Sequence, residues 1–119
     1  MPTRIEIGID SNNPEQLAVF WADALGYAVG DLDDAAVYLD LIPPRPDLPV
    51  VYLQRVPDPK TVKARVHLDL YEVDAPAKIA SLLARGATLL GAPQTGSQGG
   101  WWQVLADPEG NEFCVCDAT

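Results

Sequence analysis

The side chains best suited to chemistry lie close together in the stretch 65–70, Arg-Val-His-Leu-Asp-Leu. It holds His67, which is the only histidine in the 119-residue chain, and Asp69 two positions later. Apolar residues alternate with other residues here, and a period of two is typical of a strand with one buried face. We therefore predict a strand over residues 63–71. Its apolar members, expected to pack against a core, are Val66, Leu68 and Leu70.

His67 should then share the opposite face of this strand with Asp69 and look into something polar or concave. Imidazole groups ordinarily titrate at about pH 6.5, so a histidine can move protons near neutral pH. Three interpretations stay open. His67 acts as a general base, or it lines a pocket and hydrogen-bonds to Asp69 or Glu6, or it has no role.

Aromatic and sulfur-containing side chains add further candidates. Trp101 and Trp102 are adjacent, so they must point to opposite faces of one strand. We expect one of them in the core and the other in a pocket, where its ring would attract a cationic group. Cys114 and Cys116 are about 6.6 Å apart along a predicted strand, which suits a disulfide poorly. We expect both thiols to be reduced, and Cys114 to be buried and inert rather than a nucleophile.

Composition indicates a soluble domain. The chain carries a net charge of −9, and 48% of its residues are hydrophobic, enough for a core and too many for disorder. The few basic residues do not cluster, which argues against a nucleic-acid partner. No apolar run approaches the roughly 18–20 residues that span a bilayer, and no signal-peptide pattern precedes the first strand pattern. We expect a cytoplasmic protein without a membrane partner.

Both halves of the chain show the same order of predicted elements. A capping residue followed by proline begins each helix, and a glycine ends it. The first half should contain a strand over 3–10, a helix between Asn13 and Gly26, a turn over 30–34, and strands over 27–29, 36–42 and 50–56. The second half should contain a strand over 63–71, a helix between Asp74 or Ala75 and Gly86, and strands over 87–90, 101–106 and 112–116.

This order is an internal repeat. An offset of 61 aligns Glu6 with His67, and an offset of 60 aligns Gln54 with Cys114. The predicted fold class is α+β, with two βαβββ modules whose eight strands form a cup and whose helices lie outside. We expect a single domain over 1–119. It should consist of module one at about 3–56, a connector at 57–62 and module two at about 63–117.

Several stretches together resemble one known superfamily. They are Phe20 through Gly26, Tyr52 through Lys60, Val66 through Leu70, and Asp-Pro-Glu-Gly-Asn-Glu-Phe-Cys-Val at 107–115. In this order and spacing they resemble the vicinal oxygen chelate superfamily, which includes glyoxalase I, bleomycin-resistance proteins and extradiol dioxygenases. The chain is most similar to the glyoxalase-like branch, over nearly its whole length. The resemblance implies a homodimer and a small-molecule ligand or substrate in the cup.

For metal-dependent members, the resemblance implies ligands at Glu6, Gln54, His67 and Cys114. Cys114 stands where a glutamate is usual, and Glu112 on the same strand face could take its place. Zinc accepts nitrogen, sulfur and carboxylate oxygen, whereas magnesium and manganese prefer oxygen-rich sites. We expect no bound metal. The alternative is zinc, nickel, iron or manganese held by His67, Glu6, Gln54 and Glu112.

Two main function classes follow. We favour a binding module for a small organic ligand. Its expected contacts are Asp69, Gln54, Tyr52, Cys114 and one of Trp101 and Trp102. The alternative is a metal-dependent lyase or dioxygenase of the glyoxalase kind, with His67 and Glu6 as the catalytic residues. A third interpretation is a dimeric accessory domain without chemistry.

Overall fold

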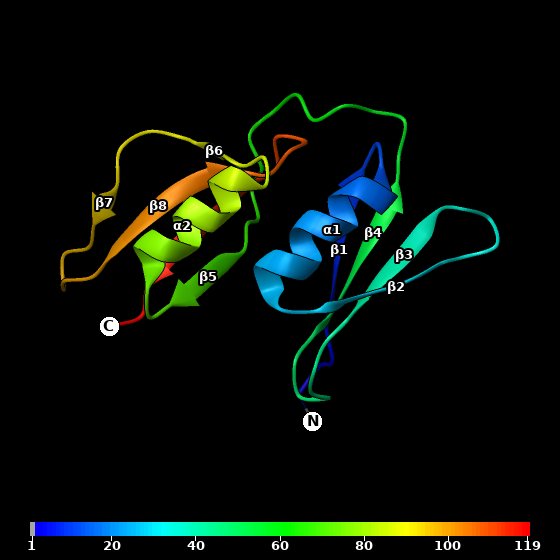
Figure 1. Ribbon diagram of the computed structural model, residues 1–119, viewed down its shortest axis with the longest axis horizontal. Helices are drawn as coiled ribbons and strands as arrows, with labels where there is room; N and C mark the ends of the chain where they lie inside the picture. Colours follow the sequence, from blue (N-terminus) through cyan, green and yellow to red (C-terminus); the bar gives the residue numbers. More distant parts are fainter. Residues whose placement is uncertain (1) are drawn as a thin grey trace. The chain divides into compact units, whose positions relative to one another are not determined.

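The computed structural model describes residues 2–119, which form two compact units. We call the described residues up to Pro59 module one, and the residues from Lys60 to Thr119 module two. In Figure 1 module one runs from blue to green and module two from green to red. Each module contains one helix and one mixed sheet.

Module one contains a four-stranded sheet and one helix. Its elements are β1 (Glu6–Ser11), α1 (Pro14–Leu25), β2 (Ala28–Leu32), β3 (Tyr38–Ile42) and β4 (Val50–Arg55). The strand order is β1-β4-β3-β2, so the first and last strands of the module are neighbours. These two run parallel, and the other pairs are antiparallel. The buried core residues of the module include Leu17, Phe20, Trp21, Leu39, Leu41, Val51 and Leu53.

The sequence signals at the ends of α1 act as predicted. The Oδ1 atom of Asn13 accepts a hydrogen bond from the backbone N–H of Gln16 at 3.4 Å. Gly26 ends the helix in the left-handed region with φ 72°, a conformation that glycine adopts without steric cost. Phe20 and Trp21 pack edge to face with ring centroids 5.4 Å apart, and both are buried. This arrangement confirms the predicted apolar face of the helix.

Module two repeats this topology. Its elements are β5 (Asp69–Glu72), α2 (Ala75–Ala84), β6 (Thr88–Leu89), β7 (Gln94–Thr95), β8 (Trp101–Ala106) and β9 (Glu112–Asp117). The main order β5-β9-β8-β6 again places the first strand beside the last, in parallel. The short β7 pairs with β8 and raises the number of strands in residues 2–119 from the predicted eight to nine. Neither helix in this part of the chain is long and apolar enough to cross a membrane.

The turn between β8 and β9 is built on Asp107, which is only 3% exposed. Its carboxylate accepts hydrogen bonds from the backbone N–H groups of Glu109 at 2.8 Å and Asn111 at 3.0 Å. A third bond comes from Nδ2 of Asn111 at 2.8 Å. Because a buried carboxylate needs such donors, these bonds hold the turn in one shape and set the register of β9.

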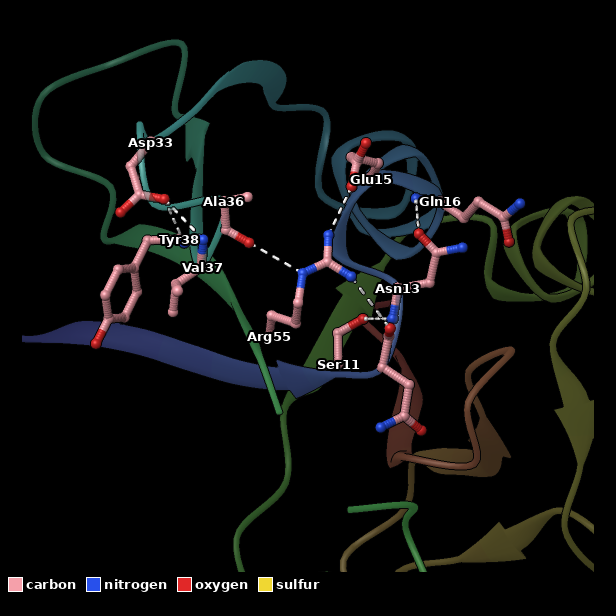
Figure 2. Close-up of polar contacts among 10 residues, drawn as sticks. Ser11, Asn13, Glu15, Gln16, Asp33, Ala36, Val37, Tyr38 and Arg55 are labelled. Carbon is pink, nitrogen blue, oxygen red and sulfur yellow. Dashed lines mark hydrogen bonds and ion pairs between the residues drawn. The ribbon is translucent and has the colours of Figure 1, made fainter. Parts of the chain in front are cut away.

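Arg55 holds together one end of module one (Figure 2). Its Nε donates to the carbonyl oxygen of Ala36 at 2.9 Å, and its Nη2 lies 2.7 Å from the carboxylate of Glu15 at the start of α1. Ala36 has φ 59°, in the left-handed region that side chains with a Cβ rarely adopt. Figure 2 also shows Asp33 accepting the backbone N–H of Tyr38, which closes the same turn.

The predicted α+β class and the repeat of two βαβββ modules are confirmed, but some strand limits are not. β1 and β5 are edge strands of the described sheets, and their ladder pairing begins at Glu6 and at Asp69. Residues before these two positions stay outside the sheet. Ile5 is 61% exposed and Val66 is 88% exposed, so the prediction that Val66 packs on a core is wrong. The turn predicted over 30–34 is also wrong, because β2 pairs with β3 as far as Leu32.

Candidate functional site

One face of the sheet in module two carries both cysteines, and we call it the cysteine face. Parallel pairing of β5 and β9 places Asp69 beside Cys114. Antiparallel pairing of β8 and β9 places Trp102 beside Cys116. Side chains of paired residues point to the same side of a sheet. The cysteine face therefore includes Asp69, Tyr71, Trp102, Val104, Cys114 and Cys116, with Ala106 and Glu112 at one end. The other face carries buried core residues such as Phe113.

Three chemically active side chains meet at one end of the cysteine face. The Nδ1 atom of His67 lies 2.9 Å from Oδ1 of Asp69. A ring nitrogen of His67, a carboxylate oxygen of Asp69 and Sγ of Cys114 all lie within 4.8 Å of one another. The side chains of His67 and Asp69 are 43% and 41% exposed, whereas Cys114 is buried. The cluster is therefore open to water on one side and anchored in the sheet on the other.

The thiol of Cys114 is held in its protonated form. Burial, and after it the negative charge of Asp69, raises the pKa of Cys114 to about 11. A hydrogen bond between the thiol and Asp69 acts in the same direction, and the charge of Lys63 opposes it. Burial also raises the pKa of Cys116. Both cysteines are free, as predicted, and neither has the thiolate character of a nucleophile.

Glu112 has a structural role, which its contacts with Lys60 and Ala64 define. Its carboxylate lies 2.7 Å from Nζ of Lys60 and accepts the backbone N–H of Ala64 at 3.1 Å. The hydrogen bond from Lys60, more than any other cause, holds the pKa of Glu112 below its usual value. These contacts fasten the segment 60–64 to the start of β9. The structure thus gives Glu112 an anchoring role, and the carboxylate nearest to His67 is that of Asp69 instead.

The corresponding face of module one is lined by tyrosines, and we call it the tyrosine face. Gly8 pairs with Tyr52, and Gln54 pairs with both Asp10 and Tyr38. The ring of Tyr52 lies over Gly8, where a Cβ would come within 2.6 Å of the ring carbon Cζ. Tyr38 and Tyr52 pack edge to face with centroids 6.1 Å apart. The missing side chain of Gly8 therefore creates the space that the Tyr52 ring occupies.

Glu6 and Gln54 lie on this face but not together. Glu6 pairs with Val50, four positions before Gln54 on β4. At about 3.3 Å per residue, these four positions place Glu6 and Gln54 about 13 Å apart along the strand direction, which is too far for both to bind one ion. Glu6 is instead paired with Arg4 at 2.7 Å on an exposed part of the strand. The structure does not bring the predicted metal ligands Glu6 and Gln54 around one point.

The pairing registers also correct the repeat. Gln54 pairs with Asp10, and Cys114 pairs with Asp69. If Gln54 and Cys114 are counterparts, then Asp69 corresponds to Asp10, and the offset of the first strands is 69 − 10 = 59 rather than 61. The alignment of Glu6 with His67 is therefore inconsistent with that of Gln54 with Cys114. An alternation pattern cannot detect this, because a shift by two residues keeps every side chain on its face.

The two tryptophans separate as expected by face but not by burial. Trp102 lies on the cysteine face, and Trp101 lies on the opposite one. Neither is fully buried, so the prediction that one is a core residue is wrong. The ring of Trp102 comes near Gly96, where a Cβ would be 3.6 Å from its Cζ3 atom. Trp102 thus stands beside the glycine-rich loop and, with the exposed Tyr71, gives this face its aromatic surface.

Three functional features escaped the sequence analysis. Asp69 was expected near His67, but its contact with Cys114 depends on the register of β5 and β9. The pairing of Lys60 with Glu112 joins residues with no local pattern in common. The role of Gly8 beneath Tyr52 becomes visible only once β1 and β4 are aligned. The parallel pairing of each module's first and last strands was the missing information in two of these cases.

Comparison with known proteins agrees with this architecture. The family model for the glyoxalase-like domain matches residues 6–116, so the chain belongs to the glyoxalase-like domain family. A search of curated proteins finds no match.

Solved structures share the fold at low sequence identity. A glyoxalase/bleomycin resistance protein/dioxygenase family enzyme from Burkholderia phytofirmans PsJN is similar with a TM-score of 0.76 and 17% identity, covering 96% of this chain and 97% of its own. A superfamily member from Sphaerobacter thermophilus DSM 20745 has a TM-score of 0.72 and 20% identity, with 98% of each chain covered. A bleomycin-binding protein in complex with bleomycin has a TM-score of 0.66 and 19% identity, covering 99% and 100%.

Proposed function

We propose that this protein binds a small organic molecule on the cysteine face of module two. One observation carries the proposal: a half-buried indole, Trp102, shares this face with the exposed pair of His67 and Asp69. The strand positions of the face include no lysine or arginine. An aromatic surface beside a few placed polar groups is the usual composition of a small-molecule site.

The chemistry of the face favours one kind of ligand. The indole offers stacking area, and the carboxylate of Asp69 accepts hydrogen bonds or pairs with a positive charge. The net charge of −9 attracts cations and repels anions. We therefore expect a ligand with a flat ring and a protonated nitrogen. A bleomycin-binding protein with the same fold supports small-molecule binding as a use of this architecture.

Fluorescence titration of the purified protein tests the proposal. The probes are bleomycin and two matched sets of small aromatic compounds, amines and carboxylates. Saturable quenching by bleomycin or the amines, absent with the carboxylates, is the expected result. Trp102→Leu should abolish it, and Trp101→Leu, on the opposite face, should leave the affinity unchanged. No saturable response to any probe, or an equal effect of both variants, would contradict the proposal.

A second candidate function is that of a metal-dependent lyase or oxygenase. It is favoured by the donor atoms of His67, Asp69 and Cys114, which lie within 4.8 Å of one another. Protein produced with zinc, nickel, iron or manganese should then retain stoichiometric metal and turn over a hemithioacetal or a catechol. Metal-free protein without such activity would exclude it. A homodimer, which the family resemblance implies, belongs to the same proposal, and light scattering tests it.

A further inference from the structure

A hollow lies at one end of module one, beyond the first paired residues of β1 and β4. Its volume is about 410 Å³, and about 300–1,000 Å³ is usual for small-molecule sites in proteins. Two segments form its sides: residues 3–5, which precede β1, and residues 46–49, which precede β4. In Figure 1 the dark blue segment before β1 lies beside the loop that joins β3 to β4. The hollow is built from module one alone, whereas the ligand site proposed above lies in module two.

The sequence explains why the sheet opens here. Pairing of β1 with β4 begins at Glu6 and Val50. Before Val50 the chain contains Pro46 and Pro49, which have no backbone N–H to donate to a neighbouring strand. The ladder therefore does not continue towards residues 3–5, and the two segments leave a space between them.

One side of the hollow is fixed in shape. The backbone N–H of Leu48 donates to the carbonyl oxygen of Arg45 at 3.3 Å, which closes a tight turn with Pro46 at its second position. The hydroxyl of Tyr27 donates to the carbonyl oxygen of Pro49 at 2.7 Å. Because these bonds and the proline rings hold the loop, a ligand meets a preformed wall, and little ordering entropy is lost on binding.

The lining combines an apolar surface with one charge of each sign. Arg4 belongs to one side of the hollow and Asp47 to the other. Ile5 is 61% exposed, so its side chain is available to a ligand. The apolar residues of the lining are Ile5, Pro46, Leu48, Pro49 and Val50.

Both charged groups can take a further partner. Nη1 of Arg4 lies 2.7 Å from the carboxylate of Glu6, and Nε of Arg45 lies 3.1 Å from Oδ1 of Asp47. The side chains of Arg4 and Asp47 are 81% and 68% exposed, and ion pairs between such exposed groups contribute little to stability. These four charges sum to zero, whereas the whole chain carries −9. A ligand without net charge, but with a charge of each sign, matches this local balance.

From this geometry we propose that the hollow binds a short apolar peptide with free ends, of the size of a dipeptide. Its terminal carboxylate pairs with Arg4, its terminal ammonium pairs with Asp47, and its aliphatic side chains cover Ile5 and Leu48. The two charged residues lie on opposite sides of the hollow. A ligand whose own charges are separated by a peptide bond therefore fits better than a single amino acid, whose charges share one carbon atom.

The experiment titrates the isotopically labelled full chain with leucyl-leucine and follows the backbone amides by NMR. We expect saturable shifts of the amides within residues 3–6 and 47–51. Binding should be about fivefold weaker for the N-acetyl derivative, which lacks the ammonium, and for the C-terminal amide, which lacks the carboxylate. Arg4→Gln should make the dipeptide and its amide bind equally. Asp47→Asn should make the dipeptide and its N-acetyl derivative bind equally.

Two matched apolar variants provide the control. Ile5→Ser removes an exposed aliphatic side chain from the hollow and should weaken binding by about tenfold. Val19→Ser removes a similar side chain, 58% exposed on α1 and outside the hollow, and should leave the affinity unchanged. No saturable shift, derivatives that bind as tightly as the dipeptide, or equal effects of the two serine variants would overturn the proposal. These peptides carry no aromatic ring, so the outcome is independent of the titration proposed for the cysteine face.

Discussion

Replacing Gly8 with alanine should displace the Tyr52 ring on the tyrosine face but lower the free energy of unfolding only slightly. A Cβ at this position would lie 2.6 Å from Cζ and Oη of Tyr52, so the ring must move away. Gly8 does not have a positive φ, so its backbone accepts alanine. The displaced ring loses its edge-to-face contact with Tyr38, a contact with ring centroids 6.1 Å apart.

The magnitude follows from two opposing terms. Loss of the contact between Tyr38 and Tyr52 costs about 0.5–1.5 kcal/mol. Alanine at position 8 also lowers the conformational entropy of the unfolded chain, which stabilises the folded protein by about 0.4–1 kcal/mol. The net loss in the free energy of unfolding is therefore at most about 1 kcal/mol. The near-ultraviolet circular dichroism of the tyrosines should nevertheless change clearly, because the Tyr52 ring leaves its position over Gly8.

A double-mutant cycle measures the energetic coupling between position 8 and the Tyr52 ring, because it compares the effect of Gly8→Ala on stability in two backgrounds. Gly8→Ala is made in the natural chain and in Tyr52→Leu, and each protein is unfolded in urea. In the leucine background alanine should stabilise by about 0.4–1 kcal/mol, because no ring has to move. The two backgrounds should thus differ by about 0.5–1.5 kcal/mol. Equal effects of alanine in both backgrounds would refute the placement of the Tyr52 ring over Gly8.

Three further predictions concern the residues that position the two faces, and urea unfolding checks each. Asp107→Ala removes three hydrogen bonds at a position 3% exposed and should cost about 3 kcal/mol, whereas a loss below about 1 kcal/mol would contradict the described turn. Glu112→Gln removes the partner of Lys60 and should cost about 1 kcal/mol at pH 7. Because folding lowers the pKa of Glu112 from its usual 4.5, its contribution is complete above that value and is lost as the pH falls through the lower folded pKa. The difference in stability between the natural chain and the variant should therefore shrink as the pH is lowered below 4.5, and a difference that stays constant would contradict this linkage. Ala36→Gly relieves a φ of 59° and should raise stability by up to about 1 kcal/mol, and a clear loss would mean that Arg55 does not hold this turn in the left-handed region.

Local signals predicted the elements of the fold well, because each signal and its effect lie within a few residues. Asn13 and Gly26 define α1, and Asp74 begins α2 with its side chain accepting the N–H of Ala77. The order of elements then led to the two modules. Alternation also placed His67 and Asp69 side by side.

The composition of the site depended on contacts that local patterns do not contain. The register of β5 against β9 decides that Asp69 meets Cys114, and a two-residue shift would leave the alternation intact. Glu112 forms an ion pair with Lys60, which lies 52 positions earlier in the sequence (112 − 60). A predicted strand also needs a neighbouring strand, and Val66 precedes the pairing of β5 with β9, which begins at Asp69. These contacts join residues far apart in the sequence, so the local pattern around each residue could not predict them.

The parallel pairing of β1 with β4 and of β5 with β9 has a consequence for biosynthesis. Within residues 2–119, the first strand of each module to leave the ribosome has the last strand of that module as its only sheet neighbour. Neither sheet can therefore be completed until nearly the whole module has emerged, and the edge of β1 stays unpaired while α1, β2 and β3 are made. All strands of module one are available once Arg55 has emerged, so module one can fold while module two is still being synthesised. The topology therefore allows two successive folding events during synthesis, each completed when the last strand of its module pairs with the first.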